Sequence, residues 1–343
     1  MMTGLASLVR AVAWPIAAIV FTLLLGFLLV AAVSDDPVLA YRELLFANFR
    51  SANTFSLFLN RATFLILIAL GIVFSFRAGV FNVGGEGQLY LGAMSATVVG
   101  VVFAGLPAVI LLPLVVLAGV AAGAIWGWIP GELKVRLGVD EVVSTLMLNF
   151  IALLITSWLV NTSMRDTGAY GAVSWLIPSD IWLPGIPGLP KATIGFPIAV
   201  VLALLSWVVL FRTEWGANLR AAGTNLRFAE AIGIAAKKEI VRAMILSGGL
   251  AGLAGVIYVL GIGHRFEQNF SPSYGLIGLT VGLLARVHPI GALATGLFYA
   301  MLLNGAAYMQ IATEVPRALV ALLAGLIVLF MTARLRAGPQ AAG

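Results

Sequence analysis

The 343-residue sequence contains no cysteine and only two histidines. Disulfide bonds, thiolate metal sites and cysteine nucleophiles are therefore excluded. The two histidines, His264 and His288, fall at opposite membrane faces in the topology predicted below, so they cannot share a metal ion. We predict no metal site in this chain.

Charged residues are also scarce. They make up 10% of the chain, and hydrophobic residues make up 61%, whereas a soluble domain has about a quarter charged residues. So few polar side chains cannot cover a water-soluble globule of this size, and we expect the chain to lie in a bilayer. The net charge of +6 then indicates topology, and no nucleic-acid partner is expected.

Motifs for ATP or peptide hydrolysis are missing. The sequence has no G-x-x-x-x-G-K-[ST] and no H-E-x-x-H, so the chain is not expected to hydrolyse ATP by that route, and no catalytic residue is assigned. No Asp, Glu, Lys or Arg falls in the middle of a predicted span, where proton-coupled carriers usually place relays. A sodium-coupled carrier remains open at this point.

Uncharged runs between charged residues predict the membrane spans. They cover residues 11–34, 62–76, 87–131, 142–164, 192–211, 243–263, 268–285, 287–313 and 318–333. The run 87–131 is long enough for two helices with a turn near Gly105, so we predict an all-α bundle of about ten spans in one domain, residues 1–343. The run 11–34 exceeds the apolar core of a signal peptide, which predicts a retained first helix.

The basic residues orient the bundle. With both termini in the cytoplasm, 13 of the 20 basic residues face inside, six of them in the loop 212–242, as the positive-inside rule requires. The loop 161–194 is then extracytoplasmic, and its Trp and Pro residues suit a folded interfacial cap. Residues 35–61 form either an ordered loop or a short amphipathic surface helix with Leu44, Leu45 and Phe49 on one face.

A glycine-rich turn follows the second predicted span. It contains Asn82, Gly84, Gly85, Glu86 and Gly87. The glycines permit close backbone approach, Asn82 can cap a helix start, and Glu86 suits a helix N-terminus. The spacing fits no nucleotide fingerprint, so the turn is predicted to be a tightly packed structural re-entry into the membrane.

The loop 212–242 is predicted to hold two short helices, 215–222 and 226–232. Gly223 would break the first, Asn225 would cap the second and Gly233 would end it. Leu226, Ala229 and Ile232 would form a small apolar edge. A docking site for a cytosolic partner and a solvated basic loop fit this pattern equally well.

Neutral polar side chains lie on the inner half of the span 142–164. Ser144, Thr145 and Asn149 are the best candidates for lining a translocation pathway, although interhelical hydrogen bonding is the favoured interpretation.

Four segments together resemble the permeases of the ribose, branched-chain amino acid and nucleoside group of ABC importers. They are FNVGGEGQLYLGA, GELKVRLGVDEVVSTLMLNFIA, GANLRAAGTNLRFAEAIGI and FSPSYGLIGLTVGLLARVHPIGALATG. The likeness covers about residues 60–335 and is strongest to the nucleoside branch, whose permeases depend on a basic membrane lipoprotein. Thr280 and the run Ala285–His288 depart from the group's usual residues, which puts the solute in doubt rather than the fold.

The resemblance implies a transport subunit of the bacterial inner membrane rather than an enzyme. It implies a separate cytosolic ATPase that binds ATP and Mg²⁺, a second and related permease, an extracytoplasmic binding lipoprotein, and surrounding membrane lipid. A neutral polar solute, above all a nucleoside, suits spans without charge; a simple sugar, a flavin or a partner-independent carrier are the alternatives. The residues assigned to ATPase coupling are Gly216, Asn218, Arg220, Gly223, Asn225, Glu230 and Gly233.

Overall fold

The computed structural model describes residues 20–313 and, beyond them, 315–316, 318–319, 322 and 325–326. This part of the chain is mostly helical. Its contacts divide the chain into two compact units, one made of residues 1–58 and 298–343 and the other of residues 59–297. Each unit is described by itself.

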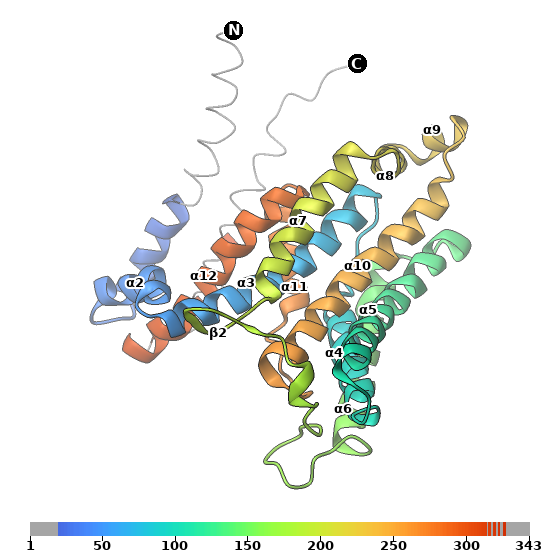
Figure 1. Ribbon diagram of the computed structural model, residues 1–343. Helices are drawn as coiled ribbons and strands as arrows, with labels where there is room; N and C mark the ends of the chain where they lie inside the picture. Colours follow the sequence, from blue (N-terminus) through green and yellow to red (C-terminus); the bar gives the residue numbers. More distant parts are fainter. Residues whose placement is uncertain (1–19, 314, 317, 320–321, 323–324, 327–343) are drawn as a thin grey trace. The chain divides into compact units, whose positions relative to one another are not determined.

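The larger unit is a bundle of helices that contains the candidate functional site (Figure 1). The helices of the chain from α3 onward are α3 (Ala52–Arg77), α4 (Gly85–Val102), α5 (Ala108–Glu132), α6 (Glu141–Asn161), α7 (Gly195–Arg212), α8 (Glu214–Thr224), α9 (Leu226–Ala231), α10 (Ala236–Tyr258), α11 (Tyr274–Leu284) and α12 (Pro289–Thr313), with π turns η2 (Leu133–Leu137) after α5 and η4 (Val259–Gly263) after α10. The first residues of α3 and the last of α12 belong to the smaller unit.

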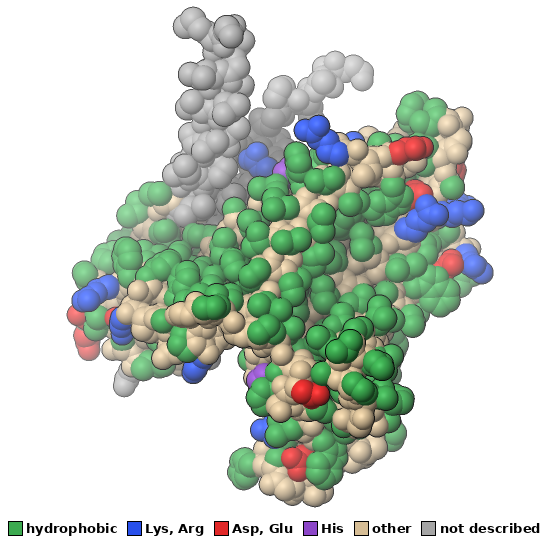
Figure 2. Space-filling model, in the orientation of Figure 1, with side chains coloured by type: hydrophobic (Ala, Val, Ile, Leu, Met, Phe, Trp, Pro, Cys, Tyr) green, Lys and Arg blue, Asp and Glu red, His purple; other side chains and the backbone are tan. Residues whose placement is uncertain are grey.

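Glycines let α4, α5 and α10 touch through their backbones. A Cβ at Gly123 would lie 2.8 Å from the Cα of Gly252, and a Cβ at Gly92 would lie 2.5 Å from that same atom. Such small faces replace the hydrophobic driving force that is missing between helices in lipid. Apolar side chains cover the sides of the unit between its charged ends (Figure 2).

The smaller unit contains α2 (Pro37–Phe46), the 3₁₀ turn η1 (Ala47–Phe49) and the adjoining ends of α3 and α12. Asn48 joins η1 to α12, because its Oδ1 accepts a hydrogen bond from Asn304 at 2.7 Å. Leu44 is buried whereas Phe49 is 57% exposed. The predicted common face of Leu44, Leu45 and Phe49 is therefore wrong, because the chain turns between α2 and α3.

Six described helices are long and apolar enough to cross a membrane: α3, α5 with η2, α6, α7, α10 with η4, and α12. The turn predicted near Gly105 does separate α4 from α5. The predicted span 268–285 is reduced to α11, whose 11 residues cover about 16 Å at 1.5 Å per residue, half of a bilayer. Most of the predicted span 318–333, and residues 11–19 of the first, lie outside the described residues, so the count of ten is not confirmed.

The loop 161–194 is folded and rests on the segment after α10. It contains a 3₁₀ turn η3 (Ser179–Ile181) and an antiparallel pair, β1 (Gly185–Ile186) and β2 (Leu189–Thr193). Its main chain bonds to that segment at four points, for example from Ile177 N to His264 O at 2.9 Å. The ring of Trp182 stacks on His264 with centroids 3.6 Å apart.

Candidate functional site

The loop 212–242 begins with a sharp corner between α7 and α8. Thr213 caps α8, since its Oγ1 accepts a hydrogen bond from Gly216 N at 3.1 Å. A Cβ at Gly216 would lie 2.6 Å from the carbonyl oxygen of Leu210. The corner therefore requires glycine at 216 for space, and it aims α8 away from α7.

Gly223 packs against the end of α3 and does not break α8. The helix continues to Thr224, and Gly223 does not have a positive φ, so the predicted helix break at Gly223 is wrong. A Cβ there would meet the carbonyl oxygen of Arg77 and would lie 2.8 Å from Gly79 N. The glycine is required because two backbones touch, which ties α8 to the last residues of α3.

The second short helix follows the predicted pattern. Asn225 caps α9, with its Oδ1 accepting from Phe228 N at 3.0 Å. Gly233 has a φ of +88°, the left-handed conformation that favours glycine after a helix.

The apolar edge of α9 differs from the predicted one. Ala229 is buried and packs with Ala222 and Ala236. Phe228 and Ile232 are exposed by 59% and 56%. Ala229 thus lies on the inner side of α9, and Phe228 lies on its exposed side. Of the other residues predicted to couple to the ATPase, Asn218 is half-buried and Glu230 is exposed.

Three side chains meet at the ring of Phe211, the residue before the last of α7. The guanidinium carbons of Arg77 and Arg220 lie 5.4 and 5.1 Å from the ring centroid, and the imidazole of His288 stacks on it at 5.1 Å. Arg77 Nε also donates to the carbonyl oxygen of Val287 at 2.9 Å. We call Arg77, Phe211, Arg220, Val287 and His288 the Phe211 junction; it joins α3, α7, α8 and the turn between α11 and α12.

The turn at the Phe211 junction is strained. Arg286 and Val287 both have positive φ, 52° and 55°, which is costly for residues with a Cβ and most of all for a β-branched one. Burial, and next the charge of Arg77, lower the pKa of His288. The neutral imidazole is therefore favoured beside the guanidinium.

The glycine-rich turn 80–87 is held by buried amides. Asn82 donates to Ser247 Oγ at 2.8 Å and to Gln88 Oε1 at 3.0 Å. Its Oδ1 accepts from Gly84 N at 2.9 Å. Gly84 itself occupies the cap position of α4, so Asn82 stabilises the approach to the helix rather than capping it.

Two of the pathway candidates tether this turn to α6. Asn149 accepts from Gly87 N at 2.8 Å and donates to Val83 O at 2.9 Å. Thr145 accepts from Val83 N at 3.3 Å. Among the described residues, the Ser144 hydroxyl bonds only within its own helix, to Glu141 O at 3.3 Å. The Thr145 hydroxyl and the Asn149 amide thus provide hydrogen-bond partners for main-chain atoms of Val83 and Gly87, at the turn between α3 and α4.

Glu86 is a buried carboxylate inside the bundle. Its Oε2 accepts from Gly275 N at 2.6 Å, in the first turn of α11. Gly85 lies against Ile68, nine residues before the end of α3, or about 14 Å along the helix axis. Glu86 lies in the first turn of α4, as predicted for a residue that suits a helix N-terminus. Because α4 starts within the bundle, Glu86 also joins the first turns of α4 and α11.

Sequence analysis missed Arg77, Phe211 and His288 as parts of one site. They lie on separate segments, and a single aromatic residue at a helix end carries no pattern. Arg77, the basic residue that ends α3, was interpreted only as a span boundary, although a guanidinium group can also indicate an aromatic partner.

Residues 54–339 match the family model described as a branched-chain amino acid transport system permease component. The chain is 30% identical to the nucleoside ABC transporter permease protein NupB of Lactococcus lactis, over 95% of this chain and 92% of that protein. It is 35% identical to the guanosine permease protein NupP of Bacillus subtilis over 78% and 77% of the two chains, and 32% identical to the glucose permease protein TsgB13 of Haloferax volcanii over 92% and 86%. The chain therefore belongs to this family and is a multi-pass membrane permease component of an ABC importer.

Proposed function

We propose that this permease imports nucleosides and that the loop 212–242 receives the movement of a separate cytosolic ATPase. The main support is that one helix of the loop is attached to the bundle, whereas the other exposes apolar side chains. α8 is fixed to the bundle by Gly223 and Arg220. α9 carries the exposed apolar side chains Phe228 and Ile232, which suit docking of a partner.

Closure of the ATPase dimer on ATP and Mg²⁺ would shift α8 and α9 as a rigid body. The backbone contact between Gly223 and Arg77 would pass this shift to α3. The Phe211 junction would pass it to α7 and to the strained turn at Val287. ATP binding can drive the change only by the difference in its affinity for the two conformations. The contacts at Gly223 and at the Phe211 junction therefore have to be rigid enough to transmit the movement.

A nucleoside solute is supported by the names of the Lactococcus and Bacillus relatives. A sugar is the second candidate, because the Haloferax relative is named for glucose. Both are neutral and polar. An extracytoplasmic binding lipoprotein would supply the affinity for the solute, and a second permease would complete the channel. Ser144, Thr145 and Asn149 remain the best candidates for lining the pathway, although their hydrogen bonds favour a packing role.

The docking role of α9 is tested by changing its exposed edge. The double variant Phe228→Ser/Ile232→Ser should insert into the membrane normally and retain at least ten-fold less ATPase during purification, since two apolar contacts worth about 1–2 kcal/mol each are removed. Leu176→Ser, at a 57% exposed apolar residue of the loop 161–194, is the control and should retain the ATPase. Normal ATPase retention by the double variant would show that α9 is not the docking site.

A further inference from the structure

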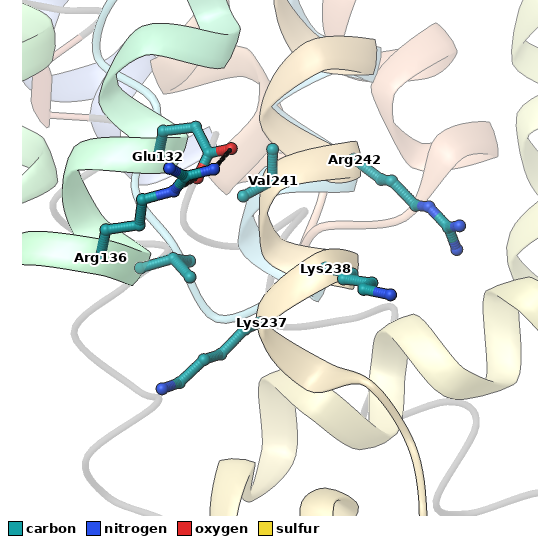
Figure 3. A pocket seen from close by; sticks show the side chains of 7 residues that line it. Glu132, Arg136, Lys237, Lys238, Val241 and Arg242 are labelled. Atoms are coloured by element: carbon teal, nitrogen blue, oxygen red, sulfur yellow. Dashed lines mark hydrogen bonds and ion pairs between the residues drawn. The ribbon is translucent and has the colours of Figure 1, made fainter.

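A basic pocket lies between the end of α5 and the start of α10, outside the Phe211 junction and the glycine-rich turn. It has a volume of about 360 Å³. Seven residues line it: Glu132, Val135, Arg136, Lys237, Lys238, Val241 and Arg242. We call it the α5–α10 pocket. The α10 residues come from the first two turns of that helix, and Arg136 comes from η2. Arg136 extends toward Glu132, whereas Lys238 and Arg242 extend from α10 away from Arg136 (Figure 3).

The pocket has a surplus of positive charge. Arg136 is paired with Glu132 at 3.0 Å, and Arg242 with Glu239 at 2.8 Å. Within the described part of the chain, Lys237 and Lys238 form no ion pair. Like charges gathered around one cavity repel each other, so an anion that enters the pocket lowers the energy of the site.

The surroundings of the pocket are apolar and interfacial. Val135 and Val241 line its wall, and Ile125 and Leu137, on the same helical segment as Val135, are 57% and 72% exposed. Trp128 is 43% exposed, and its indole N–H donates to Glu132 at 3.3 Å. Tryptophan in this setting is typical of the headgroup level of a membrane.

We propose that the α5–α10 pocket binds the phosphate of an anionic membrane lipid, whose acyl chains follow the apolar surface of α5. A free anion would use the lysines but not the adjoining apolar surface. An acidic protein segment would use the lysines but would leave Ile125 and Leu137 uncovered. A lipid satisfies both parts, and basic pockets at the ends of membrane helices are known to suit such headgroups. The proposal goes beyond solute import and does not depend on which solute is carried.

The test uses the intact transporter complex purified in detergent, with native mass spectrometry to count bound lipid after titration with phosphatidylglycerol or phosphatidylcholine. Lys237→Gln/Lys238→Gln removes two charges from the pocket. Arg212→Gln/Arg286→Gln removes two exposed charges, one at the end of α7 and one in the turn after α11, and is the matched control. Each lysine near a membrane surface changes affinity by about five-fold, so the lysine pair should weaken phosphatidylglycerol binding by about 25-fold.

The proposal predicts this loss for the lysine variant, little change for the control, and weaker binding of phosphatidylcholine to the parent complex. Equal losses in the two variants would overturn it, as would equal binding of the two lipids. Displacement of the lipid by inorganic phosphate alone would show a simple anion site instead. Lipid binding that appears only after the ATPase has dissociated would show that the pocket is a protein interface.

Discussion

The absence of a Cβ at Gly223 allows α8 to touch the end of α3. Because a Cβ would meet the Arg77 carbonyl, the helices must separate to accept even alanine. Gly223→Ala should cost about 1–3 kcal/mol, as overpacking of a close contact does, and should reduce uptake per ATP hydrolysed.

Gly105→Ala is the matched control, because no atom of the described residues lies within 4 Å of the added Cβ and the residue does not have a positive φ. Thermal unfolding and the ratio of uptake to ATP hydrolysis measure the two effects. If Gly223→Ala matches Gly105→Ala in both, the contact with α3 does not transmit movement.

Asn149 illustrates how one amide supports the break before α4. Asn149→Ala removes bonds to Gly87 N and Val83 O. We expect the complex to assemble, with a loss of about 1 kcal/mol in the free energy of unfolding, since interhelical bonds in membranes are individually weak. Ser144→Ala, which loses only a bond within its helix, should lose less. A selective change in solute affinity with Asn149→Ala would instead assign this residue to the pathway.

At the scale of elements, the sequence predicted best where local rules act. Asn225 and Gly233 bound α9 as predicted, because capping and left-handed glycine are decided by neighbouring residues. It failed at Gly223, whose surroundings are made by the end of α3, far away in the chain. Hydrophobic runs also cannot distinguish a span from α11, which is equally apolar but begins only at Tyr274.

The turn between α11 and α12 should respond to acid. The pKa of His288 lies below its usual value because of burial and then Arg77. The stabilising contribution of the neutral ring is thus complete above about pH 6.5, the pKa of an unfolded histidine, and is lost as the pH falls through the lower folded value. His288→Gln should show a flatter decline of melting temperature below pH 6.5 than the parent complex. Parallel declines would contradict this.

At the scale of the whole molecule, the topology can be tested by labelling single cysteines, since the chain has none of its own. Tyr170 and Ala235 are exposed, one in the loop 161–194 and the other just before α10. Tyr170→Cys should react with an impermeant reagent from outside intact cells, and Ala235→Cys only after the membrane is opened. The reverse result at both positions would place the loop 212–242 outside, where no cytosolic ATPase could reach it.

The central claim is that ATP hydrolysis on a partner drives nucleoside import through this chain by way of α8 and α9. The most direct measurement is uptake of a radiolabelled nucleoside by vesicles that contain the reconstituted complex, its binding protein outside and ATP inside. We predict uptake that requires ATP and is lost when the partner ATPase is inactivated. Excess unlabelled nucleoside should compete with it and glucose should not, and Phe228→Ser/Ile232→Ser should transport at least ten-fold more slowly, in line with its weaker hold on the ATPase. Uptake that persists with an inactive ATPase, or that is unaltered in this variant, would contradict the account.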